Sequence, residues 1–116
     1  MAKLLIYHNP ACGNSRGAME LLRQRGVEFD VIEYLKTPPA REALEKILAM
    51  LEGPVENLVR KDKRFDELKL NAADYTAKET VIPLLLQHPE LMQRPIVIRG
   101  GRAIIARPAN LLEKLF

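Results

Sequence analysis

The sequence contains a single cysteine, Cys12, among its 116 residues. One cysteine cannot form an internal disulfide and cannot supply a cysteine-rich metal site, so no metal site is predicted. The longest apolar run near the start, Leu4 to Tyr7, is far too short for the apolar region of a signal peptide or for a membrane span. We therefore expect a cytoplasmic protein with no membrane partner, in which Cys12 is either inert packing or a reactive thiol.

The excess of positive charge is also small. The chain has 18 Lys and Arg against 15 Asp and Glu, a formal net charge of +3, which is too little to predict a nucleic-acid partner. There is no internal repeat and no low-complexity tract. A length of 116 residues with 47% hydrophobic content is enough for one ordinary core. These features predict a single domain, 1–116, and, in the absence of an obvious exposed seam, a monomer.

The hydrophobic pattern of the first third predicts a βαβ unit. A short buried strand over 3–7 is followed by a loop, and then apolar residues recur at helical spacing up to Gly26, a residue type that often ends helices. Alternating apolar residues predict a second strand over 27–34. The two strands should be parallel, with a right-handed crossover.

The middle of the chain is helical in character. A helix should begin at Thr37 and its two following prolines and end before Gly53, with a shorter helix over 55–61 and a weak helical turn over 65–70. Thr76–Glu79 has the spacing of a capping box for one more helix, and a proline inside that helix, Pro83, should kink or shorten it.

The chain ends with a second β region. Predicted strands over 95–98 and 102–106 flank a Gly-Gly pair that suits an antiparallel hairpin, and Pro108 should open a final helix. The order is therefore βαβ, a helical insertion over 37–93, and ββα. By pattern and analogy together this is an α/β protein of the thioredoxin-like fold, with a small mixed sheet flanked by helices.

The cysteine lies in the loop between the first strand and the first helix. Free N–H groups and the positive end of the helix dipole favour an anion there, which lowers a thiol pKa from its reference value of about 8.5. His8 could add positive charge, Ser15 could cap the helix or donate its hydroxyl to the sulfur, and Gly13 would let the backbone approach a ligand. A lone cytosolic cysteine is often a buried apolar residue. Polar neighbours such as Asn14 favour a reactive Cys12 instead.

The spacing around the cysteine excludes two known thiol motifs. A cysteine phosphatase loop would need an arginine six positions after the cysteine, where Ala18 stands, and a dithiol motif would need a second cysteine at Ser15. The pattern is His8-x3-Cys12-x3-Arg16, and Arg16 could equally pair with a glutamate one turn along the helix. With no second thiol in the chain, an adduct at Cys12 must be resolved by a thiol from another molecule.

Four segments of the sequence resemble one known family. The stretch YHNPACGNSR, residues 7–16, resembles the signature loop of the glutaredoxin-coupled arsenate reductases, the ArsC family. Three others resemble the family's anion-binding positions: NLVRK with Arg60, MQRPIVI with Arg94 and IARPAN with Arg107. The resemblance covers essentially the whole chain. Arg94 and Arg107 also each precede a proline at a strand boundary, a rigid place to fix a side chain.

The resemblance implies a function and a set of site residues. Cys12, assisted by His8, would attack arsenate to form a Cys–S–arsenate adduct, and the three arginines would hold the oxygens of the oxyanion. Glutathione would be the co-substrate, glutaredoxin the protein partner and arsenite the product, with no bound cofactor. By analogy with the fold, the peptide bond before Pro95 should be cis.

Two other functions remain open at this point. One is an ArsC-related glutathione-dependent thiol oxidoreductase of unassigned substrate, in which the arginines bind the carboxylates of glutathione. The other is an Spx-like regulator that binds RNA polymerase, which a redox pair of cysteines would favour and a single cysteine does not. A reactive thiol on this fold does not by itself select arsenate over another oxyanion.

Overall fold

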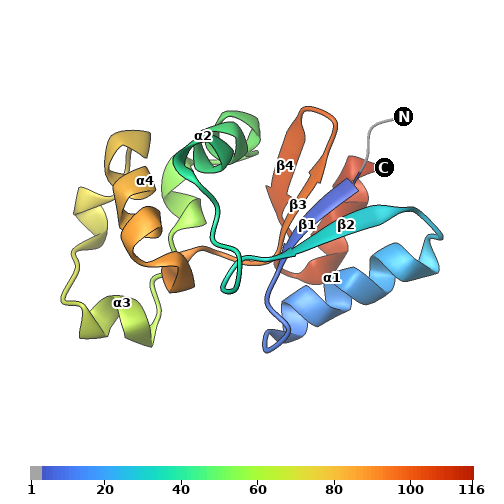
Figure 1. Cartoon of the computed structure of the whole chain (residues 1–116), viewed down its shortest axis with the longest axis horizontal. Helices are drawn as coiled ribbons and strands as arrows, with labels where there is room; N and C mark the ends of the chain where they lie inside the picture. The colour runs from blue at the N-terminus through green and yellow to red at the C-terminus, as the bar shows by residue number, and fades with distance from the viewer. Residues whose placement is uncertain (1–3) are drawn as a thin grey trace.

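A computed structural model describes residues 4–116, and its first third is the predicted βαβ unit (Figure 1). Strand β1, Leu4–His8, is followed by helix α1, Gly13–Gln24, and strand β2, Phe29–Glu33. β1 and β2 are parallel. Gly26 follows α1 with a φ of 69°, a left-handed conformation that favours glycine. β2 is shorter at both ends than the predicted 27–34, and Lys3 of the predicted first strand lies outside the described residues.

The sheet has four strands in the order β2-β1-β3-β4. Strand β3, Ile96–Arg99, runs antiparallel to β1, and strand β4, Arg102–Ile105, runs antiparallel to β3. The mixed sheet and the terminal hairpin are therefore as predicted. Together with its flanking helices, the sheet confirms the α/β, thioredoxin-like fold class.

The segment between β2 and β3 is helical and lies beside one end of the sheet (Figure 1). It occupies most of the predicted insertion, 37–93, although the division of 1–116 into one domain with this insertion stays a prediction. Its elements in chain order are α2 Arg41–Met50, η1 Val55–Leu58, α3 Lys63–Glu67, η2 Ala72–Asp74, α4 Lys78–Gln87 and η3 Pro89–Leu91.

Helix boundaries in this segment differ from the predicted ones for local reasons. α2 begins at Arg41 and not at Thr37, because a residue before proline disfavours the helical region and two prolines follow Thr37. The predicted helix over 55–61 is only a 3-10 turn, since the chain after it pairs with a distant segment: Val59 forms a β-bridge with Met92. α3 begins before the predicted turn because the Asp62 carboxylate caps it.

The predicted capping box is wrong, and of the two effects predicted for Pro83 the shortening does not occur, while the kink stays a prediction. The capping box at Thr76 does not form, since Ala77 is the N-cap residue of α4 and the Thr80 hydroxyl donates to the Ala77 carbonyl instead. Pro83 does not shorten α4, which continues to Gln87, because a proline removes a single helical donor. The final helix, η4 Ala109–Leu115, forms as predicted after Pro108 but is a 3-10 helix.

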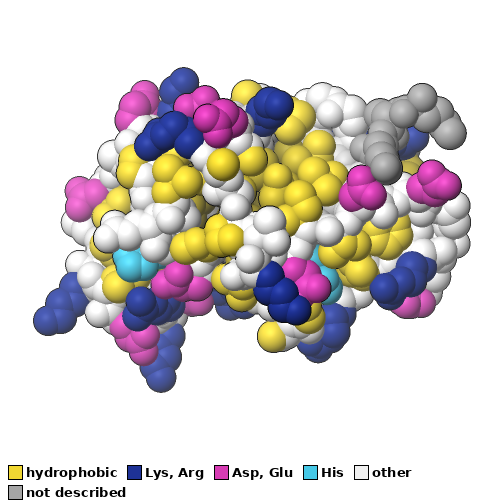
Figure 2. All heavy atoms as spheres, in the orientation of Figure 1, with side chains coloured by type: hydrophobic (Ala, Val, Ile, Leu, Met, Phe, Trp, Pro, Cys, Tyr) yellow, Lys and Arg dark blue, Asp and Glu magenta, His cyan; other side chains and the backbone are white. Residues whose placement is uncertain are grey.

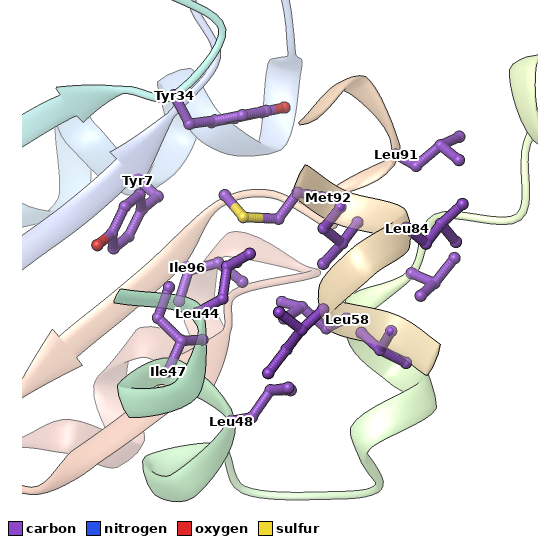
Figure 3. Close-up of a cluster of buried hydrophobic side chains, with 14 of the residues drawn as sticks. Tyr7, Tyr34, Leu44, Ile47, Leu48, Leu58, Leu84, Leu91, Met92 and Ile96 are labelled. Carbon is purple, nitrogen blue, oxygen red and sulfur yellow. The ribbon is translucent and has the colours of Figure 1, made fainter. Parts of the chain in front are cut away.

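The core consists of two clusters of apolar side chains, one on each face of the sheet. Alternate residues of a strand point to opposite faces. The first cluster, around Ile6, lies between the sheet and α1 and η4. The second cluster, around Tyr7, lies between the sheet and the helical segment (Figure 3). α1 and η4 approach closely, since a Cβ on Gly17 would lie 3.3 Å from the Ala109 Cβ. This packing fixes the chain that leads into η4 against the start of α1.

The outer surface is mixed in character. Figure 2 shows hydrophobic side chains at the surface between α2 and the sheet, with charged side chains of both signs around the periphery. Leu5, Met50, Leu51 and Ile98 are partly buried residues that pack on the second core cluster. Within residues 4–116, no helix is long and apolar enough to cross a membrane.

Candidate active site

The topology of the sheet brings three segments to one of its ends. The end of β1 lies beside the start of β3, because Tyr7 is opposite Ile96, and the end of β4 lies there too, because Ile96 is also opposite Ile105. Cys12 follows β1, Arg94 precedes β3 and Arg107 follows β4. Two arginines that are 82 and 95 positions from Cys12 in the sequence are therefore brought to the same end of the sheet as its thiol.

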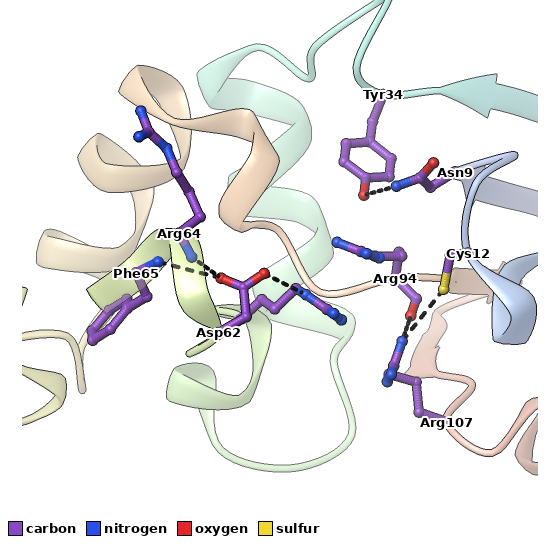
Figure 4. Close-up of polar contacts among 9 residues, drawn as sticks. Asn9, Cys12, Tyr34, Asp62, Arg64, Phe65, Arg94 and Arg107 are labelled. Carbon is purple, nitrogen blue, oxygen red and sulfur yellow. Dashed lines mark hydrogen bonds and ion pairs between the residues drawn. The ribbon is translucent and has the colours of Figure 1, made fainter. Parts of the chain in front are cut away.

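Two of the predicted arginines act on the thiol, and Figure 4 shows the contact that Arg107 makes with the sulfur. Arg107 Nη1 lies 3.5 Å from Cys12 Sγ and also donates a hydrogen bond of 3.0 Å to the Arg94 carbonyl. The Arg94 side chain interacts with the thiol as well. The peptide bond between Arg94 and Pro95 is cis, as predicted, and the bond between Arg107 and Pro108 is also cis, which was not predicted.

The surroundings of Cys12 favour its thiolate. Cys12 is the N-cap residue of α1 and is only 8% exposed. Burial raises the pKa of the thiol, but the Ser15 backbone N–H and the Arg94 and Arg107 side chains lower it by more, so the pKa falls from 9.0 to about 7. About half of the molecules therefore carry a thiolate at neutral pH. The backbone contribution comes from the N–H of Ser15, in the first turn of α1.

The Ser15 side chain neither caps α1 nor donates a hydrogen bond to the sulfur, the two roles expected of it. It is fully buried and points back toward β1, where its hydroxyl lies 2.8 Å from His8 Nδ1 and accepts a hydrogen bond of 2.9 Å from the Asn9 N–H. Ser15 thus holds the cysteine loop against the end of β1, and its N–H group, not its hydroxyl, acts on the sulfur.

His8 does not supply the expected positive charge. Burial lowers the pKa of the imidazole, and although Glu33 raises it, Arg23 and Arg16 lower it further. The ring is therefore neutral at pH 7, and its Nδ1 faces the Ser15 hydroxyl. A catalytic role for His8 stays a prediction.

The remaining residues of the loop have mainly local contacts. Arg16 does not pair with a glutamate; its Nη1 donates a hydrogen bond of 2.9 Å to the Pro10 carbonyl. A Cβ at Gly13 would lie 3.8 Å from Arg16 Nη2, an ordinary contact, so the protein's own packing does not require glycine there. Asn14 is partly exposed in the first turn of α1. Asn9 Oδ1 accepts a 3.0 Å hydrogen bond from the Ala11 N–H, which closes the turn before the cysteine.

The third predicted arginine, Arg60, is paired with an aspartate. Arg60 Nε donates a hydrogen bond of 2.8 Å to Asp62 Oδ2, while the other Asp62 oxygen accepts from the backbone of Arg64 and Phe65 at the start of α3 (Figure 4). Burial raises the pKa of Asp62, but Arg60 and these N–H groups lower it by more, so the carboxylate is ionised at neutral pH. The structure thus brings Arg94 and Arg107 together at the sulfur and ties Arg60 to α3.

Comparison with known proteins agrees with this arrangement. A profile of the ArsC family matches residues 7–115. The chain belongs to the ArsC family. It is 41% identical over 116 residues to the arsenate reductase of Escherichia coli (strain K12), covering 99% of this chain and 82% of that protein. It is 35% identical to an arsenate reductase of Neisseria meningitidis serogroup A, covering 97% of each chain.

A solved structure confirms the fold of this ArsC-family chain. The structure described as an arsenate reductase from Vibrio cholerae superposes with a TM-score of 0.87 at 31% identity and covers 99% of this chain and 98% of that one. The resemblance predicted from the cysteine loop and the three arginine segments is therefore confirmed at the level of the family.

Sequence reasoning missed two residues of the site, Asn9 and Tyr34. Tyr34 is fully buried, and its hydroxyl accepts a hydrogen bond of 3.5 Å from Asn9 Nδ2 (Figure 4). Burial raises the pKa of Tyr34, whereas the charge of Arg94 lowers it, so the phenol stays protonated next to that guanidinium. One signal was available: Tyr34 is the last residue of the predicted second strand, and parallel neighbours end at the same edge of a sheet.

The described residues around the thiol form no cluster of metal ligands. Among the residues that the structure describes, no group of three or more His, Cys, Asp and Glu side chains could hold a metal ion. The groups gathered here are one thiol, two guanidinium groups, helix N–H groups and a phenol, which suit an anion.

Proposed function

We propose that this ArsC-family protein is an arsenate reductase, an oxidoreductase that converts arsenate to arsenite. The observation that carries the proposal is the Cys12 thiol, with its pKa near 7, lying 3.5 Å from the Arg107 guanidinium and in contact with Arg94. A thiolate repels an anionic substrate, and two fixed guanidinium groups offset that repulsion. Relatives that are 35% to 41% identical are arsenate reductases.

The first step is attack by Cys12 on arsenic. A sulfur–arsenic bond forms, and the displaced oxygen takes up protons and leaves as water. Arg94 and Arg107 bind the remaining oxygens with charge-assisted hydrogen bonds. Arg94 Nε is buried and has no hydrogen-bond partner, so a substrate oxygen would satisfy a donor that the protein leaves unpaired. Arg60 is a third ligand once the oxyanion competes with Asp62 for its guanidinium.

Reduction then requires thiols from outside the chain, because Cys12 is the only cysteine. Glutathione is the co-substrate that attacks the adduct, and glutaredoxin is the protein partner that removes glutathione. In the complete cycle two thiols become one disulfide, and the two electrons released reduce arsenic from the arsenate to the arsenite state.

Turnover tests the proposal directly. Purified protein supplied with arsenate, glutathione and glutaredoxin should release arsenite, and Cys12→Ser should release none. Lys46→Gln, a change of an exposed residue on α2 away from the sulfur, serves as the matched control and should keep wild-type turnover. An inactive wild type, or full activity in Cys12→Ser, would exclude the function.

A further inference from the structure

A cavity lies beside the thiol site, and the two share Arg107. It has a volume of about 610 Å³, within the range typical of small-molecule sites, and Arg107 forms part of its wall. From Arg107 it extends along β4 and η4 to the segment that follows η1. The same guanidinium group thus contacts Cys12 and borders a space large enough for a small peptide.

The wall of this cavity carries more positive than negative charge. Lys61 and Lys114 line it together with Arg107, and both lysines are exposed. Glu52 is the only acidic residue in the lining, and a hydrogen bond from Arg102 lowers its pKa, so it stays ionised. The cavity therefore offers three cations and one anion.

The cavity also contains an unpaired hydrogen-bond acceptor. Gln93 lines it, and Gln93 Oε1 is buried with no partner. A buried polar atom without a partner costs about 1–3 kcal/mol, so a ligand that brings an N–H group to it gains affinity. Beside it runs β4, the edge strand of the sheet: its Ala103 already forms a bridge with Leu51, and its Ile105, further along the strand, lines the same space. An edge strand can bind an extended peptide backbone.

We propose that this cavity is the glutathione site, an inference that rests on the proposed function. Glutathione is a short extended peptide with two carboxylates, one ammonium group and amide N–H groups. Its carboxylates match Lys61 and Lys114, its ammonium group matches Glu52, and an amide N–H matches Gln93 Oε1. Since Arg107 both lines the cavity and contacts Cys12, a ligand thiol placed beside Arg107 lies next to the Cys12 adduct, where proximity accelerates the reaction.

Kinetics test the proposal. Lys114→Gln should raise the KM for glutathione about fivefold, the effect of losing one exposed ion pair, and should leave the KM for arsenate within twofold of the wild type. Lys61→Gln should act in the same direction, although its Nζ also donates to the Glu56 and Val59 carbonyls. Lys46→Gln, outside the cavity, is the matched control. An unchanged KM for glutathione in Lys114→Gln would overturn the assignment.

Binding without chemistry provides an independent test. S-methylglutathione keeps both carboxylates but cannot react, so it can be titrated into the ¹⁵N-labelled wild type. The Ile105 amide and the Gln93 side-chain amide should shift, with weaker binding in Lys114→Gln; shifts at neither residue would refute the site. If the wild type failed to reduce arsenate, the proposed function would be wrong, and this titration would still decide whether glutathione occupies the cavity.

Discussion

Replacement of Arg107 by glutamine should return the Cys12 thiol toward its ordinary acidity. The fall in pKa from 9.0 to about 7 corresponds to roughly 3 kcal/mol of net stabilisation of the thiolate. Three groups provide it against the opposing effect of burial: the Ser15 N–H, Arg94 and Arg107. The loss of one group should therefore remove at least about 1 kcal/mol and raise the pKa to about 8.

The two consequences of that change partly cancel at pH 7. The thiolate fraction falls from about one half to about one tenth. A thiolate of higher pKa is, however, a better nucleophile, by about threefold for each unit of pKa. The rate of alkylation at pH 7 should thus fall by only about twofold. The midpoint of the pH profile moves much more clearly than the rate at any single pH.

The assay is alkylation with iodoacetamide between pH 5 and pH 10. The reagent is neutral, so the loss of an arginine does not alter its approach through charge, and the chain has no other cysteine to contribute. The matched control is Arg102→Gln, on the far end of β4 and paired with Glu52. A wild-type midpoint near pH 9, or the same midpoint in Arg107→Gln and the wild type, would refute the account of the site.

Three further results should follow. Ser15→Ala breaks two buried contacts, those with His8 and the Asn9 N–H, and should lower the free energy of unfolding by about 1–3 kcal/mol in urea titrations. Asp62→Ala should cost about 1 kcal/mol by the same measurement through loss of the α3 cap, whereas Asp62→Asn keeps an acceptor oxygen and should cost less. Because the folded pKa of Cys12 lies below the unfolded one, its contribution is fully present above pH 9 and lost as the pH falls to about 7; the unfolding free energy of the wild type relative to Cys12→Ser should therefore rise by up to about 3 kcal/mol across that window.

The parts of the fold that depend on local pattern could be predicted from the sequence. Alternating apolar residues identified the strands, and the Gly-Gly pair identified the hairpin between β3 and β4. Cys12 was predicted to be reactive because polar residues surround it at the start of a helix, and the Ser15 N–H at that helix start lowers the pKa of its thiol. These features depend on neighbours within a few residues along the chain.

The parts that depend on distant contacts could not be predicted. The pairing of Val59 with Met92 replaces a helix that local pattern favoured, and no periodicity indicates it. Arg60 and Asp62 are close in sequence, but only the structure shows that the Asp62 carboxylate both caps α3 and accepts a hydrogen bond from Arg60. Likewise Tyr34 resembles an ordinary core residue until Arg94 is placed beside it.

The groups that ionise the thiol come from positions 15, 94 and 107, so the acidity of Cys12 exists only while the chain is folded. In the unfolded chain at pH 7 the thiolate population would fall from about half to about one per cent. Most buried cysteines become more reactive when a protein opens, but here opening would lower the thiolate population about fiftyfold, and a gain in nucleophilicity of roughly tenfold would offset only part of that loss. A denatured molecule would therefore form mixed disulfides about fivefold more slowly than a native one at pH 7.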